Sequence, residues 1–150
     1  MRRRATITWL DRPPEGTGRV RVDSRAFTAL PISAPGDEAP HPRQATPGEL
    51  LAAAHGAVFL GALAELLEAD GTPARELVVN ADCELGAEKL DHRLVAVEIG
   101  AHGIVDGIDE RGFEATAAVA LERLRDWLGI DDSLEVSVHA HLRGELRRSG

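Results

Sequence analysis

The stretch that decides the fold spans residues 46–71 and reads TPGELLAAAHGAVFLGALAELLEADG. Thr46 is a favourable helix N-cap, and Pro47 suits the first helical turn because its missing N–H is not needed there. Glu49 completes a Thr-x-x-Glu capping box, and Gly71 is typical of the residue that follows a helix C-terminus. These signals predict one helix with both ends defined.

The interior of this helix is apolar almost all round. From Leu50 to Leu63, His55 is the one side chain that is neither apolar nor glycine. A helix without a polar face must be buried on all sides in a soluble protein. We therefore expect a long buried central helix, with a sheet on one side and a partner, such as a second subunit, on the other.

The composition indicates a single soluble domain over residues 1–150. Hydrophobic residues make up 43% of the chain and charged residues 28%, with a net charge of −8. A nucleic-acid-binding surface needs a basic excess, so we expect no nucleic-acid partner. No signal peptide follows the N-terminal arginines, and the uninterrupted apolar run reads as too short for a membrane span. The sequence thus predicts a cytoplasmic protein without a membrane partner.

Alternating and amphipathic patterns surround the central helix. A second helix is predicted from its N-cap Asp109 to Leu128, with Gly129 ending it. Prolines in residues 31–47 predict a long loop. Strands are predicted over residues 5–10, 19–24, 27–30, 75–85, 92–101 and 134–142, with a hairpin turn at 86–91. This order predicts an α+β fold with an antiparallel sheet and two helices.

Three segments resemble the OsmC/Ohr family, the osmotically inducible and organic hydroperoxide resistance proteins. Residues 46–59 resemble that family's Asn-Pro-Glu-Glu-Leu motif and the Ala-Ala-Ala-His segment that follows it. The resemblance continues through residues 81–85 and 107–113, and element order and length agree over nearly the whole chain. It implies an OsmC/Ohr-like fold that forms an intertwined homodimer, with the two central helices side by side. Such a dimer would explain a helix that is apolar on every face.

The resemblance also implies a thiol peroxidase site whose residues this chain lacks. In the family, a peroxidatic cysteine on the central helix and a resolving cysteine on the second helix form a disulfide, and a glutamate and an arginine activate the first thiol. Here Val58 and Leu124 stand at the cysteine positions, and Gly48 stands at the glutamate position. Arg43 lies too close to the helix to match the arginine, and Glu49 matches only a less specific acidic position. We therefore predict no thiol-dependent peroxidase activity.

Cys83 is the one cysteine of the chain. Its predicted strand face is apolar, and burial raises the pKa of a thiol and makes it inert. An intrachain disulfide cycle is excluded because there is no second sulfhydryl. Residual hydroperoxide reduction through Cys83 remains a lesser alternative.

Histidines offer the other candidate chemistry. His55 is interpreted either as a structural buried histidine or as an acid/base group assisted by Glu49 or Arg43. His139 and His141 lie on one strand face about 7 Å apart, a spacing that permits a metal pair. Polar strand faces are usually solvated, so we predict no metal site, and the sequence calls for no cofactor.

Two functions follow from different classes of protein. In the first, a stress-response-type protein binds a small hydrophobic or lipid-like molecule in the former hydroperoxide pocket, covered by the loop 31–47. That pocket is predicted to be lined by Val58, Leu124, Gly48 and Phe59. In the second, an enzyme of another class uses His55 as acid or base. A purely structural role is a third possibility, and the sequence names no ligand or substrate.

Overall fold

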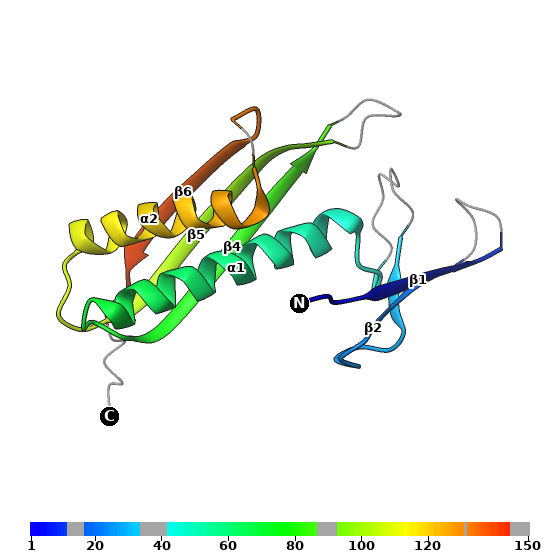
Figure 1. Ribbon diagram of the computed structural model, residues 1–150, viewed down its shortest axis with the longest axis horizontal. Helices are drawn as coiled ribbons and strands as arrows, with labels where there is room; N and C mark the ends of the chain where they lie inside the picture. Colours follow the sequence, from blue (N-terminus) through cyan, green and yellow to red (C-terminus); the bar gives the residue numbers. More distant parts are fainter. Residues whose placement is uncertain (12–16, 34–41, 87–92, 131, 145–150) are drawn as a thin grey trace.

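The computed structural model describes residues 1–11, 17–33, 42–86, 93–130 and 132–144. Figure 1 shows the two long helices lying together along one sheet, with the N-terminal strands to one side. The elements in chain order are β1 (Ala5–Leu10), β2 (Thr17–Val22), β3 (Leu30–Ile32), α1 (Pro47–Ala69), β4 (Ala74–Leu85), β5 (Leu94–Val105), α2 (Glu110–Leu128) and β6 (Glu135–Leu142).

The strands form two three-stranded sheets, in the orders β1-β2-β3 and β4-β5-β6. The predicted α+β class with two helices is confirmed. The antiparallel arrangement holds for β1–β2, β2–β3 and β4–β5, whereas β5 and β6 are parallel. The reason is the connection between them. The helix α2 returns the chain to the end of the sheet where β5 begins, and parallel neighbouring strands require such a crossover.

The predicted signals at the ends of both helices are confirmed. The Thr46 hydroxyl accepts a hydrogen bond from the Glu49 amide at 3.1 Å, and the Thr46 amide donates to Glu49 Oε2 at 2.7 Å. Gly71 follows α1 with a φ of 79°, in the left-handed region that glycine adopts without strain. Asp109 is the N-cap of α2, and the Gly112 amide donates to the Asp109 carboxylate at 2.8 Å.

Strand positions differ from prediction mainly near the N-terminus. The third strand is Leu30–Ile32 rather than 27–30, because its residues pair with β2 over Gly18–Val20. Part of the predicted loop is therefore strand, and Ala45 also bridges to Ile32. Residues 34–41 of the predicted loop, and most of the predicted hairpin turn at 86–91, lie outside the described residues.

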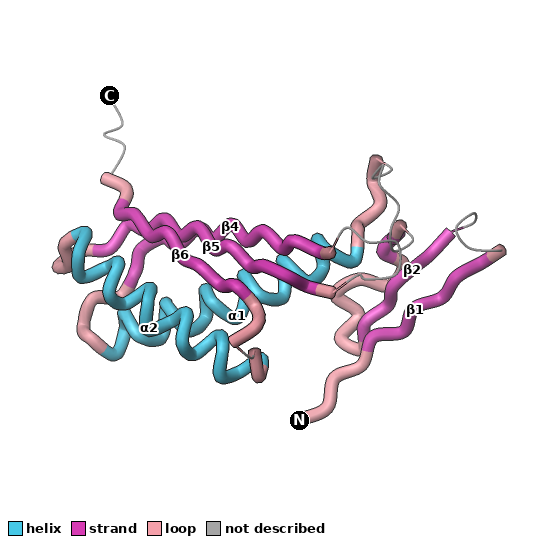
Figure 2. Tube along the Cα trace, turned by 90° about the horizontal axis from the view of Figure 1, so that it is seen from above, coloured by secondary structure: helices cyan, strands magenta, loops and turns pink. Residues whose placement is uncertain are grey.

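The core lies between the two helices and one face of the β4-β5-β6 sheet, as two layers (Figure 2). Both helices contribute a stripe of residues at helical spacing, and β5 contributes every second residue. The buried residues of this core are His55, Phe59, Leu63 and Leu67 of α1, Phe113, Ala117, Ala120 and Leu124 of α2, Val97, Ile99, Ala101 and Val105 of β5, and Ala140 of β6.

Within a single chain, α1 is buried on one face only. The sheet and α2 cover the stripe at His55, but Leu51 and Ala57 remain exposed. Burial on all sides is thus not reached within one chain. The helix, 23 residues long, is also long and apolar enough to cross a membrane by length and composition, as are core helices of soluble proteins. Length and composition alone therefore do not distinguish α1 from a membrane span.

The N-terminal sheet buries only a few apolar side chains among the described residues, chiefly Val20 and Ile32, which are 6% and 8% exposed. It stands beside the N-terminal end of α1, away from the two-layer body (Figures 1 and 2). Ile7 is 60% exposed and Leu10 57% exposed. The sheet is attached through the chain before α1, where the Ser33 amide donates to the Ala45 carbonyl at 3.0 Å. Three strands need a packed apolar face for stability, and much of the apolar surface of this sheet is exposed in the single chain.

Candidate functional site

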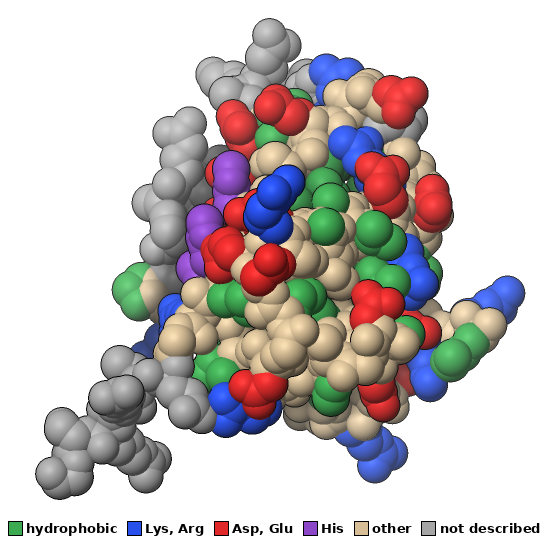
Figure 3. Space-filling view, turned by 90° about the vertical axis from the view of Figure 1, so that its left-hand side faces the viewer, with side chains coloured by type: hydrophobic (Ala, Val, Ile, Leu, Met, Phe, Trp, Pro, Cys, Tyr) green, Lys and Arg blue, Asp and Glu red, His purple; other side chains and the backbone are tan. Residues whose placement is uncertain are grey.

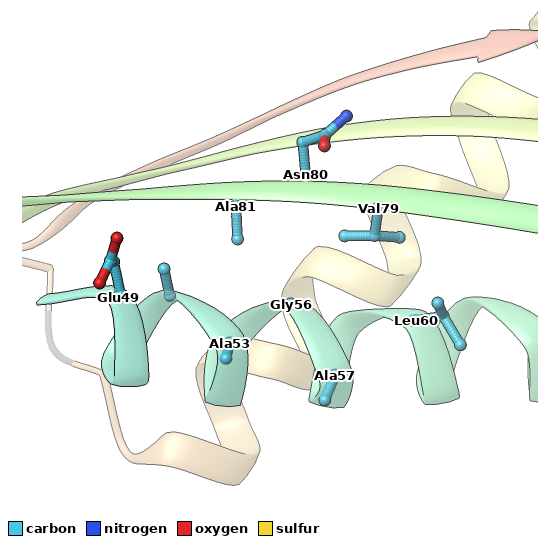
Figure 4. A pocket seen from close by; sticks show the side chains of 9 residues that line it. Glu49, Ala53, Gly56, Ala57, Leu60, Val79, Asn80 and Ala81 are labelled. Carbon is cyan, nitrogen blue, oxygen red and sulfur yellow. The ribbon is translucent and has the colours of Figure 1, made fainter. Parts of the chain in front are cut away.

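A cavity of about 380 Å³ lies between α1 and β4 (Figure 4). Gly56 lets the helix approach the strand closely, because a Cβ at this position would lie 3.3 Å from the Ala81 Cβ. Small side chains border this contact and leave a cavity that is open to the surface, where Ala53, Ala57 and Asn80 are exposed. The lining residues are Glu49, Ala52, Ala53, Gly56, Ala57, Leu60, Val79, Asn80 and Ala81.

Polar groups are few in this cavity. Figure 4 shows Val79 and Ala81 directed from β4 toward the helix, with Asn80 directed away from it. Glu49 lies at the N-terminal end of α1, where its carboxylate already accepts the amide hydrogen of Thr46. The cavity is therefore suited to an apolar molecule, with a carboxylate at one end.

The four residues predicted to line a pocket lie elsewhere. Phe59 and Leu124 are fully buried in the core, and Val58 is partly buried against it. Gly48 lies at the start of α1, where a Cβ would be 3.6 Å from Leu85 Cδ1. Among the described residues, the lining of the α1–β4 cavity includes none of these four.

The three candidate acid/base residues have separate environments. His55 is 7% exposed and lies on the core stripe of α1, with Nδ1 2.6 Å from the Leu51 carbonyl oxygen. A carbonyl oxygen can only accept a hydrogen bond, so Nδ1 of His55 carries the proton and donates it. Glu49 lines the cavity, and Arg43 is exposed with a φ of 70° in the turn before the helix. His55 thus has a structural hydrogen bond, while Glu49 serves the helix cap.

Cys83 is half-buried on β4, packed against the core as its strand face predicts. Burial raises the pKa of its thiol, and the negative charge of the neighbouring Asp82 raises it further. A thiol with a raised pKa holds little thiolate at neutral pH, and only the thiolate is nucleophilic. This position is unfavourable for peroxide reduction.

One titratable cluster was not predicted from the sequence. Glu110 Oε1 lies 3.0 Å from His141 Nδ1, and the Leu142 amide donates to Glu110 Oε2 at 2.9 Å. These two hydrogen bonds, the backbone one first, hold the pKa of Glu110 below its usual value. Figure 3 shows histidine and acidic side chains side by side on this end of the molecule. The Glu110/Glu114 spacing was visible in the sequence, but the contact with His141 joins residues far apart in the chain.

Comparison with known proteins finds similarity in structure alone. No protein-family model matches the sequence. No curated protein matches it either. An organic hydroperoxide resistance protein from Elizabethkingia anophelis superposes with a TM-score of 0.74 at 20% identity, covering 95% of this chain and 97% of that chain. The OsmC organic hydroperoxide resistance protein of Legionella pneumophila gives 0.72 at 18% identity, covering 94% and 97%. An OsmC-like protein of unknown function from Vibrio cholerae gives 0.72 at 15% identity, covering 93% and 99%. The chain therefore has the fold of the OsmC and organic hydroperoxide resistance proteins.

Proposed function

We propose that this chain is a divergent OsmC/Ohr-type stress-response protein that binds a small apolar molecule and has no thiol peroxidase activity. The observation that carries the proposal is the pair Val58 and Leu124 at the two positions where the resemblance places cysteines. Leu124 is fully buried and Val58 is packed against the same core. Aliphatic side chains there support the fold but provide no nucleophile.

The remaining sulfur is poorly placed to replace the missing pair. Burial raises the pKa of Cys83, and no second cysteine exists to resolve a sulfenic acid within the chain. A peroxidase cycle needs a thiolate that attacks the peroxide and a second thiol that reduces the resulting sulfenic acid to a disulfide, with loss of water. Both requirements count against Cys83.

The absence of this activity is directly testable. With cumene hydroperoxide and a dithiol reductant, the natural protein is expected to show no turnover above the rate without protein. The Cys83→Ala variant serves as the matched control and is expected to behave identically. A Val58→Cys/Leu124→Cys/Gly48→Glu variant measures what the missing groups would restore. Turnover by the natural protein that disappears in Cys83→Ala would contradict the proposal and assign the chemistry to Cys83.

The α1–β4 cavity is the proposed binding site for the apolar molecule. Its volume of about 380 Å³ lies within the usual range of small-molecule pockets. The proposal thus moves the pocket from the Val58–Leu124 side of α1 to the side that faces β4. Glu49 at one end offers a carboxylate that accepts hydrogen bonds, while alanine and leucine contact the apolar part.

Binding can be measured with methyl cis-parinarate, a fluorescent fatty-acid ester whose uncharged head group is not repelled by the Glu49 carboxylate. Its fluorescence is expected to rise with the natural protein, and Ala52→Leu is expected to weaken binding about tenfold or more by filling the cavity. Ala54→Leu is the matched control, because Ala54 is exposed on the same helix and lies outside the lining. Equal binding by both variants would place the ligand elsewhere or show that the ester binds nonspecifically.

The proposed assembly is an intertwined homodimer. Exposed apolar side chains on the N-terminal sheet, such as Ile7, and on α1, such as Leu51, support it. A second copy that packed against the N-terminal sheet and α1 would cover these side chains in an interface. The proposal also includes a cytoplasmic setting without nucleic-acid or membrane partners, and the net charge of −8 supports the first exclusion.

The alternative, an enzyme that uses His55 as acid or base, receives less support. His55 donates its Nδ1 hydrogen to the Leu51 carbonyl and lies on the core stripe of α1. A buried histidine with a backbone partner has a structural explanation that requires no substrate.

A further inference from the structure

Three side chains that can bind a metal ion meet where α2 begins and β6 ends. Glu110 and Glu114 lie one helical turn apart on α2, so their carboxylates project from the same face. His141 lies near the end of β6, and its Nδ1 is 3.0 Å from Glu110 Oε1. One ligand atom from each of the three residues lies within 4.8 Å of the other two.

A backbone hydrogen bond orients the carboxylate of Glu110. The Leu142 amide of the edge strand β6 donates to Glu110 Oε2 at 2.9 Å. This bond leaves Oε1 on the side of His141. An oriented carboxylate is what a metal site requires, because ligands fixed in advance lose less conformational freedom on binding.

The charges favour a cation at this point. Two carboxylates one turn apart on a helix repel each other. The ion pairs that the described residues form join no arginine or lysine to Glu110 or Glu114. A divalent cation between the carboxylates would neutralise both, despite the positive end of the α2 dipole.

The donor atoms indicate the class of ion. One imidazole nitrogen and two carboxylate oxygens match the ligands of Zn²⁺, which binds both kinds of atom at about 2.0–2.2 Å. Ca²⁺ and Mg²⁺ prefer oxygen alone, and Cu⁺ prefers sulfur. Two atoms 3.0 Å apart, as Glu110 Oε1 and His141 Nδ1 are, can both reach one such ion.

We propose that Glu110, Glu114 and His141 bind one Zn²⁺ or a similar divalent transition-metal ion. The ion takes the place of the hydrogen bond between Glu110 Oε1 and His141 Nδ1, and the imidazole binds in its neutral form with its proton on Nε2. Water occupies the remaining positions, since all three side chains are exposed. His102, opposite His141 on β5 with ring centroids 6.1 Å apart, borders the site.

This site is separate from the proposed apolar cavity. It joins the first turn of α2 to the end of β6, residues that lie far apart in the sequence. An ion that binds the folded protein and not the unfolded chain stabilises the folded protein by mass action. Zinc binding is therefore expected to raise the melting temperature, whether or not the apolar ligand exists.

The test uses the full chain without an affinity tag. Zn²⁺ is titrated by calorimetry, and Co²⁺ is titrated by its visible absorption, which reports the coordination of a bound ion. The natural protein is expected to bind one ion per chain. Glu114→Gln and His141→Ala are each expected to weaken binding about tenfold or more. His139→Ala is the matched control, because His139 is also exposed on β6 but lies 3.6 Å from Glu98 instead.

The variants separate the site from general surface binding. Glu114→Gln removes one charge and leaves the contacts of Glu110 with Leu142 and His141 in place, so it tests the site without altering the strand edge. Wild-type affinity in Glu114→Gln would overturn the proposal. So would an equal loss in His139→Ala, or a natural protein that gives no binding heat and no cobalt spectrum at millimolar ion.

Discussion

Replacing Phe113 by alanine is expected to lower the free energy of unfolding by about 3–5 kcal/mol, as for other buried phenylalanines. Phe113 is fully buried between α2 and the sheet. Its ring is so closely packed that a Cβ on Gly103 would lie 3.0 Å from Cζ. The loss combines the transfer of the ring out of the core with the cavity left behind. Urea unfolding followed by circular dichroism at fixed protein concentration measures it.

Val119→Ala provides the control on the same helix. Val119 is half-exposed on the outer side of α2, and exposed substitutions usually change stability by less than about 0.5 kcal/mol. A Phe113→Ala variant as stable as Val119→Ala would mean that the two-layer core is not packed as described.

Replacing Ala57 by arginine is expected to convert the proposed dimer into single chains. Ala57 borders the α1–β4 cavity, but its side chain is exposed and directed away from β4 (Figure 4). It lies on the face of α1 where two symmetry-related copies of the helix are proposed to meet. Each arginine would enter an apolar contact opposite its own copy, and like charges placed together at an interface cost several kcal/mol. The dissociation constant should therefore rise roughly a hundredfold or more. Light scattering after gel filtration measures the mass.

Glu122→Arg is the comparison variant, since it also adds an arginine at an exposed helix position but lies on α2. It is expected to keep the mass of two chains. A natural protein that runs as a single chain, or an Ala57→Arg protein that stays paired, would rule out the proposed packing of the central helices.

Local signals predicted both helices to within a residue at their ends. Thr46, Asp109 and Gly129 act through hydrogen bonds and backbone angles within a few residues, so the sequence contains the whole cause. Strand alternation similarly located β4 and β6. The direction of β6 was not local. It depends on the end of β5 to which α2 returns the chain, and alternation does not encode that.

The candidate site was less predictable for the same reason. Counting from shared motifs placed Val58 and Leu124, which supports the negative prediction about thiol chemistry. The cavity is lined by small side chains of α1 and β4, such as Gly56 and Ala81, which are distant in sequence. The contact of Glu110 with His141 is equally nonlocal. Neither feature has a sequence motif that would identify it.

The separation of the N-terminal sheet from the two-layer body implies an order of folding. The helices and the β4-β5-β6 sheet share one continuous core and can fold as a unit. The strands β1–β3 bury few of their apolar side chains within the chain, so little holds them together before assembly. In the proposed dimer they would therefore acquire stable structure only on association, at a rate set by protein concentration. Newly made chains would expose this segment to proteases until a partner arrives.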